Sequence, residues 1–292
     1  MNNYDVVIVG AGISGIGAAY NIQKSCPTKS FIIFEGRENI GGTWDLFKYP
    51  GIRSDSDMHT MGFRFKPWTD PKTIADGPSI LEYLNEAADE NNLREKIQFK
   101  TKVKTAQWDS NSACWRLGIE KDGSGVIQDI SCSILYLCGG YYNYDQGYLP
   151  EFEGYEDFEG TLVHPQKWPE DLDYENKKVI VIGSGATAVT IVPSMADKVS
   201  KITMLQRSPT YYFAAPDEDV IGNFIKRFTT DRLGYFLVRW KNILMQRFML
   251  ARLRKYPQKT KEMLINLVRK QLGEGYDVDR HFTPRYMPWD QR

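Results

Sequence analysis

The sequence lacks several features that would assign it to a common class of protein. Its 292 residues include four cysteines and three histidines. The cysteines form no CxxC pair and no spacing typical of metal ligands, so neither a disulfide framework nor a metal site is expected. With so few cysteines, a cytoplasmic protein in a reducing compartment is the simplest expectation.

A signal sequence, a long apolar run and an excess of one charge are also missing. Strand-like residues begin at Tyr4 with no basic region before them, so a secretory signal peptide is not expected. The most apolar long stretch, 233–253, is interrupted by four Lys and Arg residues, which argues against a transmembrane span. Basic and acidic residues number 37 each, so no overall field favours nucleic acid, and phosphate binding must be local.

Two segments share one design, in which a short apolar run leads into a glycine-rich turn and a helix of small residues. The first covers residues 6–19 and the second covers residues 179–188. Each apolar run is continuous, as is typical of a parallel strand buried on both faces, and another β-rich run follows each at 31–34 and 201–205. The pattern predicts an α/β fold with two Rossmann-like βαβ units in two doubly wound sheets.

The first glycine turn has the residues of a dinucleotide-binding loop. Gly10, Gly12 and Gly15 match GxGxxG, which permits a tight turn, close approach of a pyrophosphate and close packing of helix on strand. Glu35 ends the next strand, where its carboxylate can accept hydrogen bonds from a ribose. Because an acid disfavours a 2′-phosphate, this loop is expected to bind FAD or NAD.

The second glycine turn differs in the residue that follows it. Gly183, Gly185 and Ala188 form GxGxxA, and the next strand leads into Arg207 and Ser208. An arginine there is the expected partner of the 2′-phosphate of NADP. The alternative is a solvated surface arginine, which the register disfavours.

The remainder of the chain divides by pattern. A loop rich in Gly, Asp and Pro (41–78) precedes an amphipathic helix at 80–88, and strands are expected near 97–99, 115–119 and 134–137. Residues 221–272 have helical periodicity and many Lys and Arg, which predicts a helical insertion. Its basic face is interpreted as solvated, with peripheral contact to a membrane surface as the less favoured alternative.

Several motifs resemble the Baeyer–Villiger monooxygenases, which are class B flavoprotein monooxygenases. Residues 158–169 read FEGTLVHPQKWP and fit the fingerprint FxGxxxHxxxWP of that family. A second pattern of the family is present as GGTW at 41–44, YPG at 49–51 and Asp55. Runs at 51–58, 140–145 and 288–292 look like the ethionamide-activating monooxygenases of mycobacteria. The resemblance covers essentially all of the chain.

The resemblance implies an FAD- and NADPH-dependent reaction on a small molecule. NADPH reduces the flavin, O2 adds at C4a, and the peroxyflavin attacks a ketone carbonyl to give an ester or lactone. The same intermediate can oxidise sulfur, and an N- or S-oxidising flavin monooxygenase is the alternative within the same class. A nucleic-acid partner is not expected.

The resemblance also implies roles for individual residues. In the family an arginine near the flavin stabilises the developing oxyanion, and the matching position is Arg292, oriented by Asp55. His164 is assigned a conformational role, Trp168 a packing role, and the run 138–140 a structural one. FAD contacts are expected from Gly10, Gly12, Ser14, Gly15, Glu35, Thr43, Trp44, Asp55 and Val103. NADPH contacts are expected from Arg53, Ser54, Asp55, Gly183, Ser184, Gly185, Ala186, Thr187, Ala188, Val189, Arg207 and Ser208.

Family members are longer than this chain, at roughly five hundred residues. The chain is therefore expected to contain an incomplete FAD-binding domain (1–150), an NADP-binding domain (151–219), and a helical subdomain with the start of the return to the FAD domain (220–292). An FAD disulfide reductase is disfavoured because the redox cysteine pair is lacking. A catalytically inactive nucleotide-binding remnant remains the alternative from a different class.

Overall fold

The computed structural model describes residues 2–214 and 216–290, and these form two compact units. Unit 1 contains the residues up to Tyr49 together with Gly77–Glu170, and unit 2 contains Pro50–Asp76 together with the residues from Asp171 onward. The sequence-based boundary at residue 150 thus falls inside unit 1, and the loop 50–76 joins the second half of the chain. The assignment of nucleotides to these parts of the chain stays a prediction.

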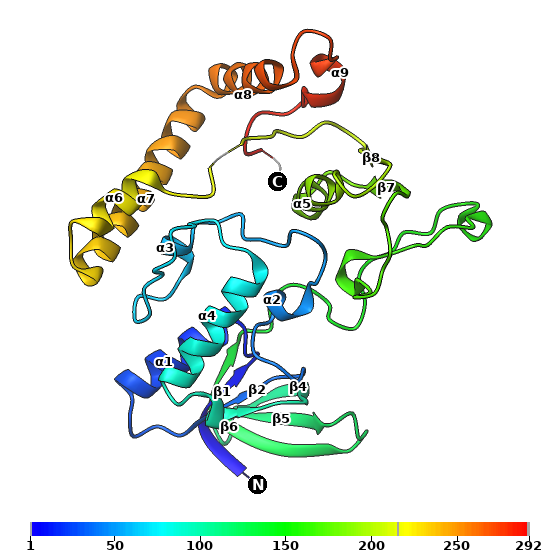
Figure 1. Ribbon diagram of the computed structural model, residues 1–292. Coiled ribbons are helices and arrows are strands. Elements are labelled where there is room, and N and C mark those ends of the chain that lie inside the picture. Colours follow the sequence, from blue (N-terminus) through cyan, green and yellow to red (C-terminus); the bar gives the residue numbers. More distant parts are fainter. Residues whose placement is uncertain (1, 215, 291–292) are drawn as a thin grey trace. The chain divides into compact units, whose positions relative to one another are not determined.

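Unit 1 is built on a mixed six-stranded sheet (Figure 1) with the strand order β3-β2-β1-β6-β5-β4. The strands are β1 (Asn2–Val9), β2 (Phe31–Phe34), β3 (Ile97–Gln98), β4 (Thr101–Asp109), β5 (Cys114–Lys121) and β6 (Ile127–Leu137). The first four in spatial order pair in parallel, and β6, β5 and β4 pair antiparallel. The expected parallel βαβ unit is confirmed.

Helices α1 (Ile13–Ser25) and α4 (Gly77–Glu90) pack against each other beside the sheet in unit 1. The side chains of Ile8, Ile33 and Ile16 are completely buried, and each such burial stabilises the fold by about 1.5–3 kcal/mol. Alternate strand residues point to the opposite face, where Val7 and Phe34 form a second buried cluster with side chains of β5 and β6.

The sheet of unit 1 curls so that the start of β4 returns to the end of β2. The N–H of Thr101 donates to the carbonyl of Glu35 at 2.8 Å, and the N–H of Lys100 donates to the carbonyl of Arg37 at 2.9 Å. The curl brings the β4 end of the sheet to the segment that follows the first βαβ unit. No sequence periodicity indicates this closure.

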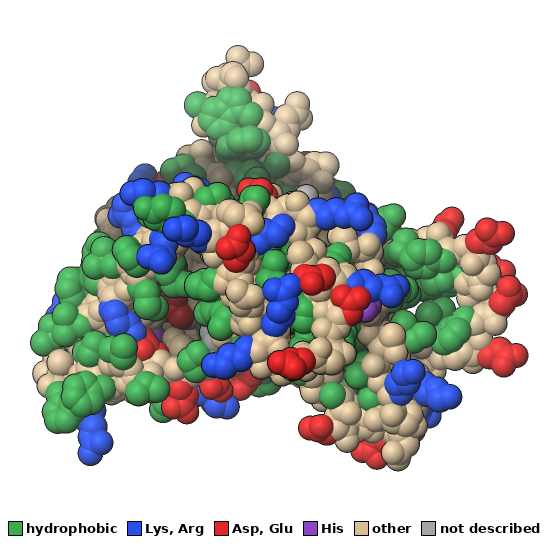
Figure 2. All heavy atoms as spheres, turned by 90° about the horizontal axis from the view of Figure 1, so that it is seen from above, with side chains coloured by type: hydrophobic (Ala, Val, Ile, Leu, Met, Phe, Trp, Pro, Cys, Tyr) green, Lys and Arg blue, Asp and Glu red, His purple; other side chains and the backbone are tan. Residues whose placement is uncertain are grey.

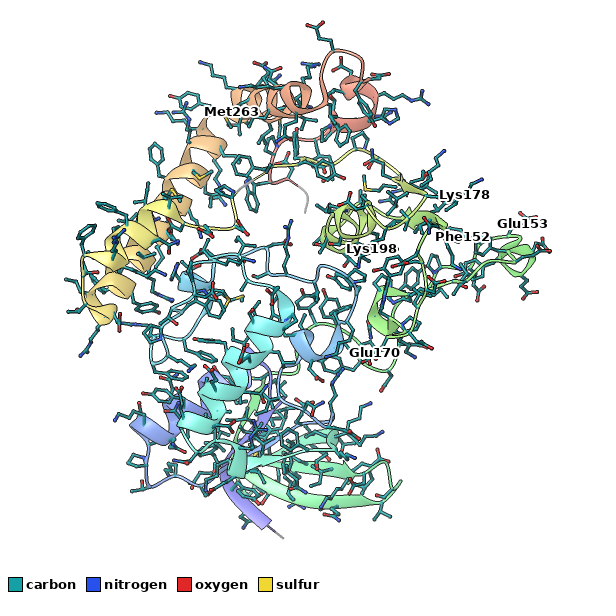
Figure 3. All side chains as sticks on the ribbon, in the orientation of Figure 1. Phe152, Glu153, Glu170, Lys178, Lys198 and Met263 are labelled. Atoms are coloured by element: carbon teal, nitrogen blue, oxygen red, sulfur yellow. The ribbon has the colours of Figure 1, made fainter. Side chains whose placement is uncertain are left out.

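Unit 2 contains the second βαβ unit, formed by β7 (Lys178–Ile182), α5 (Ala186–Met195) and β8 (Lys201–Leu205). The two strands are parallel, as predicted. Lys178, labelled in Figure 3, begins β7, and Lys198 follows α5. The prediction that this apolar run is buried on both faces is wrong for the described residues, because Ile180 and Ile182 are more than 60% exposed. Within that part of the chain β7 pairs with β8 alone, and α5 packs on both strands. The burial of β7 therefore alternates, with Ile180 and Ile182 on the exposed face.

The predicted helical insertion is present in unit 2. Its helices are α6 (Val220–Arg227), α7 (Asp231–Lys255), α8 (Pro257–Leu272) and α9 (Val278–Phe282). Two short helices, α2 (Thr43–Leu46) and α3 (Met58–Met61), lie within the Gly-, Asp- and Pro-rich segment 41–78 that was predicted to be a loop. Among the described residues, no helix is long and apolar enough to cross a membrane.

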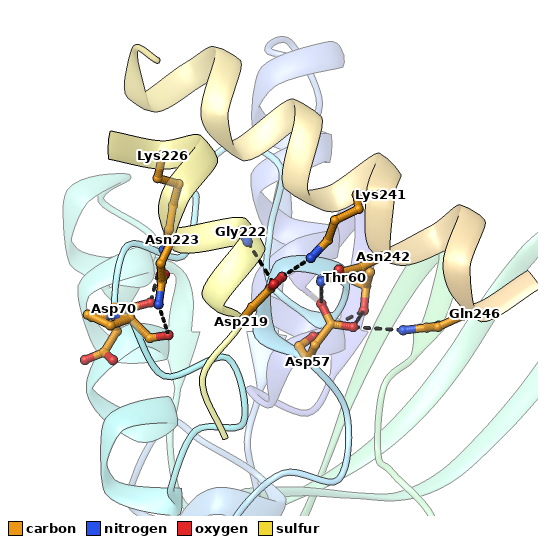
Figure 4. Close-up of polar contacts among 11 residues, drawn as sticks. Asp57, Thr60, Asp70, Asp219, Gly222, Asn223, Lys226, Lys241, Asn242 and Gln246 are labelled. Carbon is orange, nitrogen blue, oxygen red and sulfur yellow. Dashed lines mark hydrogen bonds and ion pairs between the residues drawn. The ribbon is translucent and has the colours of Figure 1, made fainter. Parts of the chain in front are cut away.

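Polar side chains fasten α6 and α7 to the 57–76 segment of unit 2 (Figure 4). The carboxylate of Asp57 caps α3 by accepting from the N–H of Thr60 at 3.0 Å, and it also accepts from Asn242 and Gln246 of α7 at 2.9 Å each. Burial alone would raise the pKa of Asp219, but its bond from Lys241 lowers that pKa below the usual value. The long helix is therefore held by buried and half-buried polar contacts as well as by packing.

Candidate functional site

The first glycine turn needs glycine at two of its positions. Gly10 has a φ of +103°, and a side chain there would place Cβ 2.5 Å from the carbonyl oxygen of Cys138. A Cβ on Gly15 would lie 1.9 Å from the carbonyl oxygen of Gly10. The tight turn and the close packing of the helix are as the glycine spacing predicted. The structure adds that the turn lies between the ends of β1 and β6.

The N-terminus of α1 opens from this turn and is suited to an anion. Gly12 is the N-cap residue of α1, and the structure describes no side-chain capping hydrogen bond to the N–H groups of the first helical turn. Ser14 lies in that first turn and is exposed. Free N–H groups at a helix N-terminus bind phosphate through hydrogen bonds and the helix dipole. This geometry fits a pyrophosphate.

Glu35 lies at the end of β2 with its carboxylate fixed next to the turn. The side chain is 3% exposed; one carboxylate oxygen accepts from the N–H of Ala11 at 2.7 Å, and the other accepts from the N–H of Arg37 at 2.9 Å. Each carboxylate oxygen has a second lone pair. The position therefore keeps acceptor capacity for the hydroxyl groups of a ribose.

The structure brings the segment 41–44 against the first turn. The N–H of Gly41 donates to the carbonyl of Ala11 at 3.1 Å, and a Cβ on Gly42 would lie 3.2 Å from the Cα of Gly12. Gly42, with a φ of +56°, precedes α2, whose first residues Thr43 and Trp44 are half-buried. Thr43 and Trp44 thus lie next to the turn. Their contact with FAD stays a prediction.

Two further segments meet the same region of unit 1. The N–H of Cys138 donates to the carbonyl of Val9 at 2.8 Å, which sets the run 138–140 beside the glycine turn. Burial raises the pKa of the Cys138 thiol, as expected of an inert structural cysteine. Val103 lies on β4, as predicted, two residues beyond the bond between Thr101 and Glu35. Its expected backbone contact to an adenine remains a prediction.

Sequence reasoning missed a polar group that covers this region. The guanidinium of Arg37 bonds the buried carboxylate of Asp45 and lies over the ring of Tyr144 at 5.6 Å. Burial, with a contribution from Glu35, raises the pKa of Tyr144, and its hydroxyl lies 3.6 Å from where a Cβ on Gly42 would sit. Arg37 and Asp45 lie eight residues apart, whereas Tyr144 comes from the segment after β6 and meets Arg37 only in the fold.

The second glycine turn, in unit 2, is open. Gly183 has a φ of +125° and its N–H donates to the carbonyl of Leu205 at 2.8 Å, while Gly185 caps α5. No described atom lies within 4 Å of a Cβ built on either glycine. The turn therefore leaves space for a ligand at the N-terminus of α5, where Ser184, Ala186, Thr187, Ala188 and Val189 follow in sequence.

Arg207 and Ser208 are exposed just beyond β8. The segment that carries them is anchored on both sides: Gln206 donates to the carbonyl of His281 at 2.7 Å, and the hydroxyl of Tyr211 donates to the carbonyl of Tyr286 at 2.5 Å. The arginine is thus positioned on a fixed backbone at the same end of the strands as the second turn. Its phosphate contact remains a prediction.

The loop residues Arg53, Ser54 and Asp55 belong to the same unit as the second turn. The loop packs on α5, because a Cβ on Gly51 would lie 1.9 Å from the hydroxyl of Ser194. Ser54 is buried, whereas Arg53 and Asp55 are exposed. Arg292, the expected catalytic arginine, lies outside the described residues, so its pairing with Asp55 stays a prediction.

The fingerprint histidine lies in unit 1, away from any acid–base partner in the described chain. Nδ1 of His164 accepts from the N–H of Gln166 at 3.2 Å, which caps a 3-10 turn at 165–167. The ring fills the space beside Gly147, where a Cβ would lie 2.0 Å from a ring carbon. The conformational role expected of His164 stays a prediction. The described residues also contain no cluster of ligands for a metal ion.

Comparison with known proteins decides the family. A family described as flavin-binding monooxygenase-like matches residues 3–256. The chain belongs to this family. It is 53% identical over 289 residues to the FAD-containing monooxygenase EthA of Mycobacterium tuberculosis, and 50% identical over 289 residues to a probable FAD-binding monooxygenase AlmA of an Acinetobacter species. These alignments cover 99% of the chain but 59% and 58% of the relatives, so the chain spans about three fifths of their length.

Solved structures confirm the fold class. A steroid monooxygenase bound to NADP is 29% identical with a TM-score of 0.67, over 80% of this chain and 43% of that one. A cyclohexanone monooxygenase with bound ε-caprolactone is 28% identical with a TM-score of 0.65, over 74% and 42% of the two chains. The predicted family resemblance and the α/β architecture are both confirmed.

Proposed function

We propose that this chain binds FAD at the first glycine turn and NADPH at the second, as part of a Baeyer–Villiger monooxygenase. The observation that carries the proposal is the difference between the two turns. The first has the buried carboxylate of Glu35 held against it, and the second is followed by the exposed guanidinium of Arg207. A carboxylate accepts from ribose hydroxyls and repels a 2′-phosphate, whereas a guanidinium binds that phosphate. The name FAD-containing monooxygenase of the relative EthA and the NADP of the steroid monooxygenase support the same assignment.

The residues of this chain bind and orient the two nucleotides. The free N–H groups at the starts of α1 and α5 hold the two pyrophosphates, and glycine at each turn allows the close approach. Bound FAD, reduced by NADPH, supplies the activation of O2 for insertion of one oxygen next to a ketone carbonyl. Asp55 is proposed to orient Arg292, which would stabilise the negative charge that develops on the substrate.

Purification of the chain tests the proposal directly. Yellow protein that oxidises NADPH and forms an ester from cyclohexanone, with one oxygen from labelled O2 detected by mass spectrometry, supports it. Colourless protein, or protein that binds NADPH without turnover, would instead support the inactive nucleotide-binding remnant for this chain.

The cofactor preference is tested by Arg207→Gln with Lys178→Gln as the matched control. Loss of a charged hydrogen bond costs about 1.5–3 kcal/mol, so the dissociation constant for NADPH should rise roughly tenfold or more while that for NADH changes little. The control removes an exposed cation from β7 and should leave both constants unchanged. Equal weakening of NADPH and NADH by Arg207→Gln contradicts the assignment.

Oxidation of sulfur is the second proposed reaction. The runs 51–58 and 140–145 resemble the ethionamide-activating enzymes, and ethionamide carries a thioamide sulfur. The same preparation assayed with a thioether distinguishes the reactions: sulfoxide without ester favours S-oxidation, and ester from the ketone favours the Baeyer–Villiger reaction.

A further inference from the structure

Positive charge is concentrated in the helical part of unit 2. Residues 220–272 contain 13 Lys and Arg and two Asp and Glu, a net charge of +11 (13 minus 2), in a chain whose overall charge is zero. The rest of the chain therefore carries −11. Such an asymmetry within a neutral protein points to a local anionic partner.

Helix α7 has an exposed row of large apolar side chains, here called the apolar stripe. It consists of Leu233, Phe236, Leu237, Trp240, Leu244 and Phe248, each 40–66% exposed. Their spacing of three or four residues puts them on one side of the helix. Exposed single apolar residues are ordinary, but a continuous row of this kind marks an interaction surface.

The apolar stripe is not the face by which α7 packs in unit 2. Tyr235, Val238 and Asn242 are buried and lie on the other side of the helix. There Asn242 bonds Asp57, and the guanidinium of Arg239 donates to the carbonyl of His59 at 2.6 Å. The helix thus has one face in the core and a second apolar face exposed.

Helix α6 adds exposed aromatic rings to the same subdomain. Phe224 and Phe228 are 65% and 69% exposed, and their rings are in contact at 4.9 Å between centroids. The helix packs against α7. Figure 2 shows green apolar side chains and blue Lys and Arg side chains intermingled at the left of the view, the side on which α6 and α7 lie in Figure 1.

Cations and aromatic rings share a hollow at the start of the stripe. It has a volume of about 680 Å³, and its lining includes the guanidinium-bearing residues Arg64, Arg232 and Arg239 beside Phe236 and Trp240. Arg247, Arg254 and Lys255, all exposed, continue the line of the stripe by helical spacing toward the end of α7. This side of the helix is therefore apolar over its first part and cationic toward its end.

We propose that the apolar stripe and its flanking arginines dock α7 on the surface of an anionic lipid bilayer, with the helix lying in the plane of the interface. Phenylalanine, tryptophan and leucine side chains enter the boundary between headgroups and acyl chains, and Lys and Arg bind the lipid phosphates. Arg64 and Arg232, which are exposed at this hollow, are suited to a phosphate headgroup, whereas Arg239 is held by the carbonyl of His59.

The charge of the subdomain favours this partner over a second copy of the chain. Two such subdomains placed together would bring like charges close to each other, which disfavours association. Nucleic acid would satisfy the cations but would not remove Leu233, Leu237 and Leu244 from water. A bilayer with anionic headgroups satisfies both kinds of side chain.

Vesicle co-sedimentation tests the proposal on the purified chain. Binding should be strong to vesicles of equal parts phosphatidylglycerol and phosphatidylcholine, weak to phosphatidylcholine alone, and reduced by high salt. The double variant Phe236→Ser with Trp240→Ser should abolish binding to the vesicles. The double variant Arg247→Glu with Arg254→Glu should lower the partition coefficient roughly tenfold or more.

Matched controls change side chains of the same kind elsewhere. Phe152→Ser removes an aromatic ring that is 48% exposed in unit 1, and Lys178→Glu with Lys198→Glu reverses exposed charges near α5 (Figure 3); both should bind vesicles as the parent chain does. Circular dichroism checks that each variant is folded. If the Phe236→Ser, Trp240→Ser variant does not fold, the Arg247→Glu, Arg254→Glu variant alone tests the proposal. Failure to bind anionic vesicles, equal binding to both vesicle types, or a dimer that the stripe variant dissociates would overturn the proposal.

Discussion

The carboxylate of Glu35 accepts a hydrogen bond of 2.7 Å from the backbone N–H of Ala11, across 24 residues of chain. The acid at the end of β2 therefore holds the glycine turn that begins at the end of β1. A residue interpreted as a ligand for ribose is also a structural part of the turn. Its substitution should affect stability and nucleotide binding together.

Glu35→Gln should destabilise unit 1 even without a nucleotide. The amide oxygen can still accept from Ala11, but the amide nitrogen would then face the N–H of Arg37, so one buried donor loses its partner at a cost of about 1–3 kcal/mol. Urea unfolding of the flavin-free protein measures this cost, and flavin content measures the loss of FAD. Glu38→Gln, which changes an exposed acid three residues away, should change neither the free energy of unfolding nor the flavin content. An unchanged unfolding midpoint for Glu35→Gln would contradict the structural role.

Gly15→Ala and Gly185→Ala should separate folding from binding. The added Cβ would lie 1.9 Å from a backbone oxygen at Gly15, whereas no described atom lies within 4 Å at Gly185. We expect Gly15→Ala to cost about 1–3 kcal/mol or more by overpacking, and Gly185→Ala to cost less than about 1 kcal/mol. Thermal denaturation compares the two variants. Titration with NADPH should then show weaker binding for folded Gly185→Ala, because its methyl group enters the space proposed for the pyrophosphate. Similar melting temperatures for both variants would show that the turn at Gly15 relaxes freely.

Asp57→Ala should loosen the attachment of α7 within unit 2. The carboxylate accepts from Thr60, Asn242 and Gln246, and its removal leaves the buried amide of Asn242 without this acceptor, at a cost of about 1–3 kcal/mol. Hydrogen exchange along α7 should accelerate in the variant. The matched control, Asp55→Ala, removes an exposed acid two residues away and should change unfolding by less than about 0.5 kcal/mol. Equal protection of α7 in both variants would contradict the anchoring role.

His59 should make unit 2 less stable as the pH falls. Burial chiefly lowers the pKa of His59 to about 4, with a smaller contribution from Lys226, although Asp57 and Asp219 oppose the effect. Neither ring nitrogen has a hydrogen-bond partner in the described structure, so the neutral ring is the form that fits. Between about pH 6.5 and about pH 4 the unfolded chain binds the proton and the folded chain does not, so stability is lost through this window by on the order of 2–3 kcal/mol.

His59→Leu should flatten this dependence by removing the titrating group. Urea unfolding at about pH 7 and about pH 5 measures the difference, which should shrink in the variant relative to the parent chain. His281→Gln, at a half-buried histidine of α9, should keep the slope of the parent chain. A slope unchanged by His59→Leu would assign the pH dependence to other groups.

The sequence by itself determined the two βαβ units, because continuous apolar runs, glycine turns and small-residue helices are local patterns with local physical causes. Glycine at positions 10 and 183 was readable, since a positive φ strongly favours that residue. The helical periodicity of 221–272 and the family fingerprint at 158–169 are also local patterns that the sequence shows directly. These features depend on neighbours in the chain.

Only the tertiary structure decided which distant segments meet. The curl that brings Thr101 to Glu35, the contact of Gly42 with Gly12, and the contact of Tyr144 with Arg37 all join residues that no spacing relates. The exposure of Ile180 and Ile182, and the two apolar faces of α7, likewise depend on which layers cover them. An apolar pattern records that a side chain favours burial, but whether a partner surface arrives to bury it is a property of packing.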